Sequence, residues 1–290
     1  MTAATDPFEG LTLAPLTVAD AARGAALSQE IGWNQNLADW RYMLANGFGH
    51  GRTDANGKLV GSAMALGYGA FAWVCMVLVS PDRRRRGIAT DLMNRVLVDL
   101  ENAGTIAGLD ATPDGREVYK HLGFEDIYRI ERYWAESVAP AGAPRTAADI
   151  GLAGKDDIAE IAERDSRVFG GDRSALLASL LRRRPDRAFV ARKGDTLTGY
   201  ALARDGRQAT QIGPLVADDP GTAVALAARA LAGLDGQAVI DCPSRHRALI
   251  EWLGASGFAY QRPYIRMLRD RSDPLDDADW VYALAGPELG

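Results

Sequence analysis

The run from Cys75 to Ala89 constrains the fold most, because an apolar stretch meets four consecutive arginines there. The β-branched residues before Pro81 are typical of a buried strand, and the proline ends it. Gly87 then opens a helical pattern, so the run predicts a strand, a basic loop and an exposed helix N-terminus. Free N–H groups, the helix dipole and guanidinium groups all favour anions at such an end. We therefore predict a site for clustered phosphates.

The loop is followed by a predicted helix over residues 87–101. Its apolar residues recur every four positions, as an amphipathic helix requires, at Ile88, Leu92, Val96 and Leu100. Residues 102–104 end this helix, and a second strand is predicted over residues 105–111. A short helix closed by Gly123 comes next.

Two motifs on these elements resemble those of the GNAT superfamily of acyl-CoA-dependent N-acyltransferases. The pyrophosphate loop of that family, Arg/Gln-x-x-Gly-x-Gly/Ala, is matched from Arg84 to Ala89. The later signature Tyr-x-x-x-Gly-Phe is matched from Tyr119 to Phe124. The expected helix and strand lie between the two motifs, and the resemblance covers residues 10–135.

Composition agrees with a two-domain enzyme. The 290 residues, of which 47% are apolar, are sufficient for two domains. No stretch approaches the roughly 20 apolar residues of a membrane span, so no membrane association is predicted. The net charge of −5 argues against nucleic acid as a partner. Cys75 and Cys242 fall one in each half on apolar strands, which favours reduced thiols and a cytoplasmic location. The three histidines are isolated, so no metal is predicted.

The second half of the chain resembles the first. A hairpin, a strand, a helix and a second strand recur in the same order. The hairpin 51–65 corresponds to 189–203, and the strand 74–79 corresponds to 211–216. The helix 87–101 corresponds to 221–233, and the second strand 105–111 corresponds to 237–242. We predict an α/β fold of two tandem GNAT-like domains, each a mixed sheet with flanking helices. The first half covers residues 1–136 and the second half residues 147–290, joined by a linker over residues 137–146.

The second half lacks the phosphate-binding residues of the first. Asp218 and Asp219 stand where the first half has arginines, and they would repel a pyrophosphate. Trp252 and Leu253 stand in the place of Tyr119. We expect only the first half to bind the cofactor and the second half to shape the acceptor site.

The resemblance implies that acetyl-CoA lies between the strands at residues 73–79 and 105–111. The pantetheine arm would pair with the backbone of the first of these strands, at Val77, Leu78 and Val79. The pyrophosphate would contact the basic loop and the first helical turn, at Arg84, Arg85, Arg86, Gly87, Ile88, Ala89 and Thr90.

The resemblance also implies a general acid. Tyr119 sits where the family places the residue that protonates the departing CoA thiolate, the alternative being that it only packs at the base of its helix. Many family members use a glutamate on the fourth strand as the general base, and residues 73–79 carry no acidic residue. The base is predicted among a relayed water, Asp110, Glu30 and Asp39. Asp110 has a counterpart in Asp241, which favours a structural role.

In this fold the acceptor is usually recognised by the turn between the first two helices. Trp33 and Asn34 lie in that turn, before a helix that Asn36 is predicted to cap, whereas Trp40 is predicted to pack in the core. We predict direct acetyl transfer to the primary amine of a small molecule in a ternary complex. The alternatives are a protein lysine or N-terminal acetyltransferase, a longer acyl-CoA as the donor, and a non-catalytic acyl-CoA sensor. The sequence leaves a monomer or a homodimer open.

Overall fold

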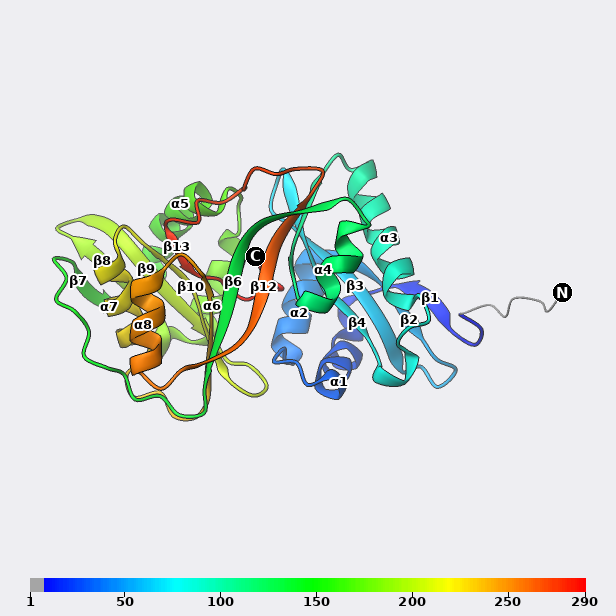
Figure 1. Cartoon of the computed structure of the whole chain (residues 1–290), viewed down its shortest axis with the longest axis horizontal. Coiled ribbons are helices and arrows are strands. Elements are labelled where there is room, and N and C mark those ends of the chain that lie inside the picture. The colour runs from blue at the N-terminus through cyan, green and yellow to red at the C-terminus, as the bar shows by residue number, and fades with distance from the viewer. Residues whose placement is uncertain (1–7) are drawn as a thin grey trace. The chain divides into compact units, whose positions relative to one another are not determined.

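The computed structural model describes residues 8–290, and its contacts divide the chain into two compact units (Figure 1). Unit 1 extends to Gly108, and unit 2 covers Leu109–Gly290. Strand β5 (Ile106–Ala111) crosses this boundary.

Unit 1 contains a sheet with the strand order β1-β2-β3-β4-β5. Its neighbours are antiparallel except β4 and β5, which run parallel. The elements are β1 (Thr12–Pro15), α1 (Ala21–Ile31), α2 (Leu37–Asn46), β2 (Gly47–Thr53), β3 (Leu59–Gly67), β4 (Phe71–Val79) and α3 (Ile88–Asn102).

Helix α3 forms where the apolar period predicts it, and its buried face packs on β3. Gly61 on β3 permits this close approach, because a Cβ there would lie 2.6 Å from Ile88 and 3.2 Å from Leu92. The helix begins at Ile88 because Gly87 has a left-handed φ of 79°, which a helix cannot contain.

Unit 2 contains a sheet with the strand order β12-β6-β11-β10-β9-β8-β7, and β13 also pairs with β10. Its helices are α4 (Pro113–Lys120), α5 (Ile158–Phe169), α6 (Ser174–Arg183), α7 (Pro220–Leu231) and α8 (Arg247–Ala255). Its strands are β6 (Phe124–Ala135), β7 (Asp149–Leu152), β8 (Phe189–Lys193), β9 (Thr196–Arg204), β10 (Thr210–Ala217), β11 (Ala238–Pro243), β12 (Ala259–Arg269) and β13 (Val281–Ala283).

Strand β6, which ends the first half of the sequence, is hydrogen-bonded to strands of the second half. It pairs antiparallel with β11 along one edge and with β12 along the other. Tyr133 faces Ile240 in the first ladder, and Ile130 faces Tyr264 in the second. The division into residues 1–136, 137–146 and 147–290 stays a prediction, and backbone pairing crosses it.

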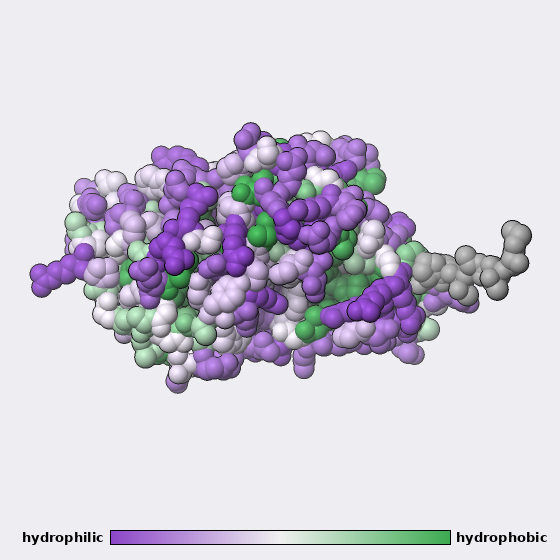
Figure 2. Space-filling model, in the orientation of Figure 1, coloured by the Kyte–Doolittle hydropathy of each residue, from purple (hydrophilic) through white to green (hydrophobic). Residues whose placement is uncertain are grey.

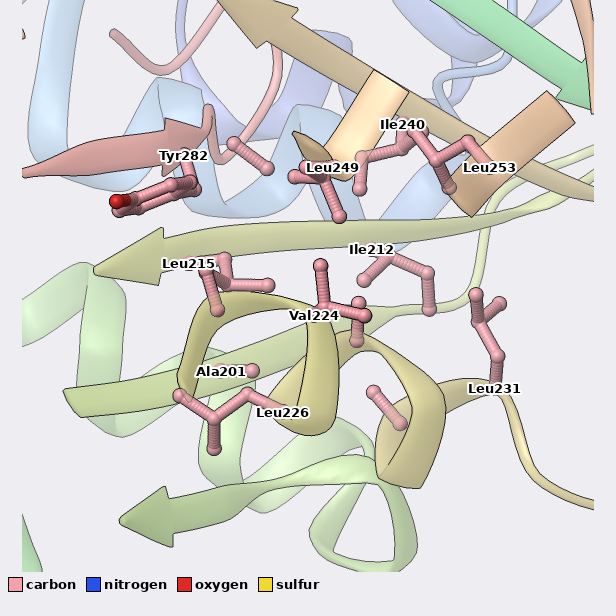
Figure 3. Close-up of a cluster of buried hydrophobic side chains, with 14 of the residues drawn as sticks. Ala201, Ile212, Leu215, Val224, Leu226, Leu231, Ile240, Leu249, Leu253 and Tyr282 are labelled. Atoms are coloured by element: carbon pink, nitrogen blue, oxygen red, sulfur yellow. The ribbon is translucent and has the colours of Figure 1, made fainter. Parts of the chain in front are cut away.

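The hydrophobic core of the second half lies between the sheet and helices α7 and α8. Figure 3 shows side chains from β10, β11, α7, α8 and β13 converging there, among them Leu215, Ile240 and Tyr282. Helix α7 approaches the sheet closely because several of its buried residues are alanines. Gly199 on β9 has the same role as Gly61, since a Cβ there would lie 3.0 Å from Leu226.

The face drawn in Figure 2 is largely hydrophilic, with only scattered apolar side chains. Cys75 and Cys242 are both buried, and neither forms a disulfide. Across residues 8–290, no helix is long and apolar enough to span a membrane.

Candidate functional site

Strand β4 carries the residues predicted to meet the pantetheine arm, and its geometry changes just before them. The parallel ladder to β5 joins three residue pairs and ends at Trp73 and Gly108. The antiparallel register with β3 then shifts, and Met76 adopts a left-handed φ of 50°. Such a bulge bends a strand and re-aims its backbone groups.

Of the three predicted pantetheine contacts, Val77 lies in this bulge, and Leu78 and Val79 follow it. Val77 and Val79 are partly exposed, whereas Leu78 is buried. The Ser62 hydroxyl donates a hydrogen bond of 2.7 Å to the Met76 carbonyl, which fixes the bulge from the β3 side. The structure therefore gives β4 a bent, partly exposed edge at the predicted cofactor segment.

The basic loop leads into the N-terminus of α3. Both Arg85 and Gly87 have left-handed backbones, with φ of 60° and 79°. No side chain caps the helix, and Ile88, Ala89 and Thr90 occupy the first turn, where N–H groups have no partner within a helix. A Cβ added at Gly87 would meet no atom within 4 Å, so the space beside these amides is open.

Three arginines of this loop, Arg84, Arg85 and Arg86, are exposed, Arg83 is partly buried, and the four differ in their partners. Arg83 lies 3.3 Å from the Asp82 carboxylate, and the Arg84 Nε donates to the Val79 carbonyl at 3.4 Å. Neither Arg85 nor Arg86 pairs with a carboxylate in the part of the chain that the structure describes. Two guanidinium groups therefore stand uncompensated beside an uncapped helix N-terminus, an arrangement suited to a polyanion.

Ser80, which was not predicted as a site residue, lies between the strand and the loop. It is fully buried, its N–H donates to the Val60 carbonyl at 2.9 Å, and its hydroxyl has no hydrogen-bond partner among residues 8–290. Buried hydroxyl groups in proteins are normally paired. A serine directly before the proline that ends the strand was the only signal in the sequence.

The turn between α1 and α2 forms as predicted. Gly32 ends α1 with a φ of 81°, and the Asn36 side chain accepts from the N–H groups of Ala38 and Asp39, so the predicted cap is confirmed. Trp40 is fully buried, and its Nε1 donates to the Ser28 hydroxyl at 2.9 Å, which confirms its packing role.

The predicted acceptor residues in this turn differ in exposure. Trp33 is half-buried and Asn34 is buried. The next residue, Gln35, is 4% exposed, and its Oε1 has no hydrogen-bond partner among the described residues. The sequence analysis did not select Gln35, because a lone glutamine in a turn carries no pattern.

Asp110, a candidate base, is buried in an ion pair. Both of its carboxylate oxygens accept from Arg266, at 3.0 Å each. Burial raises the pKa of Asp110 to about 6, and the guanidinium opposes that rise. As a base, Asp110 stays a prediction, and the bidentate pair favours the structural alternative.

Asp241 makes the same pair in the second half. Its carboxylate accepts from Arg132 on β6 at 2.7 and 2.8 Å. In both pairs the aspartate belongs to the fifth strand of one half and the arginine to the sixth strand of the other half. The matching pairs explain why the two aspartates recur in the sequence.

The remaining acidic candidates also have partners. Glu30 lies 2.7 Å from Lys58 Nζ, and the Asp39 carboxylate accepts from the Asn36 N–H at 2.9 Å as part of the helix cap. No cluster of metal-ligating side chains is found in residues 8–290.

Tyr119 lies in α4, within unit 2. Its ring packs on Phe124 with centroids 6.0 Å apart, and a Cβ at Gly115 would lie 2.9 Å from it. Burial raises the pKa of Tyr119 to about 12, so the phenol is protonated at neutral pH. Its hydroxyl makes no hydrogen bond to the described residues. The phenol is therefore able to donate a proton.

Helix α7, the counterpart of α3 in the second half, is capped at its N-terminus by the side chain of Asp219. Asp219 accepts from the Thr222 N–H at 2.9 Å and from the Thr222 hydroxyl at 2.8 Å. Asp218 is paired with Arg164. These carboxylates occupy the position at which the first half presents free amides and arginines.

Comparison with known families agrees with this geometry. Residues 20–124 match the acetyltransferase (GNAT) family, and residues 161–283 match a second acetyltransferase (GNAT) domain. The first match contains the basic loop and Tyr119, and the second contains β10, α7 and β11.

Individual proteins are similar along most of the chain. The uncharacterized N-acetyltransferase YitH of Bacillus subtilis is 23% identical over 265 residues, which are 91% of this chain and 93% of YitH. A crystal structure assigned to an acetyltransferase of Pyrococcus horikoshii has a TM-score of 0.74 at 21% identity, covering 98% of this chain and 97% of that one. A tandem GNAT protein from the clavulanic acid biosynthesis pathway has a TM-score of 0.60 at 16% identity, covering 89% and 98%. The chain therefore belongs to the GNAT N-acetyltransferase superfamily, with two GNAT domains in tandem.

Proposed function

We propose that the first half binds acetyl-CoA and transfers its acetyl group directly to the primary amine of a small molecule. Family membership gives N-acetyltransferase activity and an acyl-CoA co-substrate. The acetyl donor, the class of acceptor and the residues that act on them are our proposal.

The observation that carries the proposal is the uncapped N-terminus of α3 beside the unpaired Arg85 and Arg86. The open space at Gly87 lets a pyrophosphate reach the amides of the first turn. Charge-assisted hydrogen bonds contribute about 1.5–3 kcal/mol each, and a micromolar affinity corresponds to about −8 kcal/mol. A few such contacts would therefore supply most of the binding free energy.

The same half fits the other parts of an acyl-CoA. The partly exposed edge at Val77 and Val79 offers backbone groups to the amides of a pantetheine arm. The unpartnered Ser80 hydroxyl lies between this edge and the basic loop, where it would donate a hydrogen bond to the phosphate end of the arm. Bound acetyl-CoA would supply a thioester carbonyl for attack by the amine.

The proposed chemistry removes two protons from the ammonium form of the acceptor and delivers one to the departing thiolate. An alkylammonium with a pKa near 10 is only about 0.1% neutral at pH 7, so the acceptor must lose a proton before it attacks. We assign this step to water, because Asp110, Glu30 and Asp39 already have partners. The attacking nitrogen bonds to the acetyl carbon, the carbon–sulfur bond breaks, and Tyr119 protonates the departing thiolate. The nitrogen then loses its second proton through water, which restores the Tyr119 phenol, so that one proton in total is released to solvent.

The acceptor is assigned to the turn between α1 and α2. Trp33 offers a half-buried aromatic face to a cationic amine, and Asn34 offers polar groups beside it. The buried and unpartnered Gln35 Oε1 adds a hydrogen-bond acceptor, which suits an N–H donor rather than a carboxylate.

Calorimetric titration with acetyl-CoA is the first test, and we expect micromolar binding at one site per chain. Release of CoA is then followed with a panel of small primary amines, lysine peptides and peptides with free N-termini. Turnover on a small amine supports the proposal. Turnover on peptides alone would move the acceptor to the protein class, and binding without any turnover would identify an acyl-CoA sensor.

A further inference from the structure

The second half keeps the strand geometry of the cofactor site. The ladder between β10 and β11 joins three residue pairs and ends at Ile212 and Ile240, as the ladder between β4 and β5 ends after three. The register of β10 with β9 then shifts before Leu215, as that of β4 shifts with β3. The register of β10 shifts directly after its parallel ladder, and the register of β4 shifts two residues after its own.

The antiparallel neighbours align the two bent strands. Gly61 faces Val79 in the first half, and Gly199 faces Ala217 in the second. Val77–Val79 therefore correspond to Leu215–Ala217. The bulges themselves, at Met76 and Val77 in β4 and at Gly213 and Pro214 in β10, keep the alignment of 74–79 with 211–216, so the two landmarks differ by one residue.

The segment 278–289, here called the C-terminal segment, is paired with this part of β10. Its strand β13 is antiparallel to β10, with Ala283 facing Leu215 and Val281 facing Val216. The Ala217 N–H also donates to the Trp280 carbonyl at 3.2 Å. Backbone groups that correspond to the predicted pantetheine contacts are thus already paired.

The C-terminal segment also hydrogen-bonds to β11, where β10 and β11 are no longer paired with each other. The Leu284 N–H donates to the Asp241 carbonyl on β11 at 2.9 Å, past the end of the β10–β11 ladder. Gly213 makes room for it, since a Cβ there would lie 1.9 Å from the Leu284 carbonyl oxygen. The first half has Cys75 at the position of Gly213 when counted from the paired glycines, and Met76 when counted from the bulge. The second half therefore has a glycine where the peptide comes closest.

Side chains hold the C-terminal segment in place. The His246 Nε2–H donates to the carbonyls of Ala278 and Val281, each at 2.9 Å, and its ring stacks on Tyr282 at 3.9 Å between centroids. Glu288 forms a buried ion pair with Arg204. Figure 3 shows the Tyr282 side chain beside Leu215 in the core cluster.

We propose that the C-terminal segment is the resident ligand of a second acyl-CoA-type groove and occupies the place of a pantetheine arm. The identity of this groove rests on the proposed function of the first half. An extended peptide and a pantetheine arm share amide N–H and C=O groups, so one bent strand can pair with either. The second half is thereby closed to acyl-CoA, and each chain binds one cofactor.

The test cuts the chain before the C-terminal segment, so that its binding to the rest of the protein can be measured. A specific protease site inserted between Ser272 and Asp273, both exposed and outside helices and strands, allows the folded chain to be cut. Native mass spectrometry of the cut protein should show the C-terminal peptide retained at one per chain. Loss of the peptide with an unchanged unfolding temperature would overturn the proposal.

Two variants of the cut protein locate the contact. Gly213→Ala should weaken retention of the peptide at least about tenfold, or about 1.4 kcal/mol. The matched control is Gly254→Ala, where a Cβ meets no atom within 4 Å. Gly213 also has a φ of 143°, which strains any side chain, so a second variant outside β10 is needed. Tyr282→Ala should weaken retention of the peptide, whereas its control Tyr282→Phe should not. Equal retention in all four proteins would contradict the assigned groove.

Titration of the cut protein with acetyl-CoA separates this proposal from the proposed function. One equivalent bound with the peptide retained supports both. A second equivalent bound with the peptide retained would overturn the closure of the second groove. If the intact protein did not bind acetyl-CoA, the proposed function would be refuted. Retention of the peptide would still test whether the C-terminal segment occupies the space between β10 and β11.

Discussion

In the first half, β4 bends after its ladder with β5, and Val77 and Val79 on the bent part are partly exposed. In the second half, β10 bends at the same place, and Leu215 and Val216 are buried against β13. The helix that follows is uncapped beside arginines in one half and capped by Asp219 in the other. In our proposals, the same strand geometry receives an acyl-CoA arm in the first half and the chain's own C-terminal segment in the second half.

The largest effect is expected from separating the halves. A fragment of residues 1–136 keeps Asp110 and Arg132 and loses their partners, Arg266 and Asp241. Breaking a buried ion pair costs about 3–5 kcal/mol, and two such losses match the whole stability of many domains. We expect the fragment to show no cooperative unfolding transition by circular dichroism.

Co-expression with residues 137–290 is the control, and it should restore a folded complex. A fragment of residues 1–136 that melts cooperatively by itself would show that β6 does not need the second half.

The next largest effect concerns the anion site. Gly87→Asp places a side chain and a negative charge in the open space beside the α3 amides, and it imposes strain at a φ of 79°. Affinity for acetyl-CoA should fall by two orders of magnitude or more, about 2.7 kcal/mol. Gly57→Asp is the matched control, because Gly57 has a φ of 78° and open surroundings in the β2–β3 turn. Calorimetry that gave both variants equal affinity would remove the loop from the site.

Tyr119→Phe tests the general acid. Positioned acids contribute about 100-fold or more, so turnover should fall by that factor while affinity for acetyl-CoA stays near that of the parent protein. The solvent deuterium isotope effect on turnover, which reports proton transfer to the departing thiolate, should also be lost. Tyr42→Phe in α2 serves as the control substitution. An unchanged rate in the Tyr119 variant would leave that residue with a packing role alone.

A smaller and more informative effect is expected from the matched aspartates. Asp110→Asn and Asp241→Asn each leave a buried arginine without its carboxylate, so each should lower the free energy of unfolding by about 3–5 kcal/mol. If both aspartates are structural, turnover per folded molecule should be unchanged in both. A selective loss of turnover in Asp110→Asn, with a shifted pH profile, would instead make Asp110 the base.

The smallest effect is a pH dependence at the C-terminal segment. Burial lowers the pKa of His246, so the folded protein favours the neutral imidazole. The unfolded chain binds a proton near pH 6.5. Stability is therefore complete above that pH and is lost as the pH falls through the lowered value. Peptide retention in the cut protein should weaken over this range, and His246→Gln should flatten the profile where His121→Gln does not.

Local pattern predicted the elements of the site well. The period of Ile88 and Leu92 gave α3, the Asn36 cap was correct, and the repeated landmarks revealed a duplicated fold. These features depend on residues a few positions apart, which is the range over which helix periodicity and capping operate.

Strand partners were not predictable in the same way. The alternation of apolar and polar residues in β6 predicts a strand and its buried face, but it fits many partner strands equally well. It therefore does not identify β11 and β12 as the neighbours. The burial of Ser80 and Gln35 depends on packing from distant parts of the chain. The apolar run at Val281–Ala285 could have indicated a buried strand, although its place between β10 and β11 could not be read from it.

The pairing of β6 also sets an order of events on the ribosome. Neither edge of β6 has a partner until β11 and β12 have been synthesised, and roughly a hundred residues at about 5–20 per second take on the order of ten seconds. Through that interval the nascent chain displays two unpaired strand edges, which invite association with neighbouring polypeptides. A chain that stops early leaves Asp110 without Arg266, so we expect its first half to stay incompletely folded and open to proteolysis.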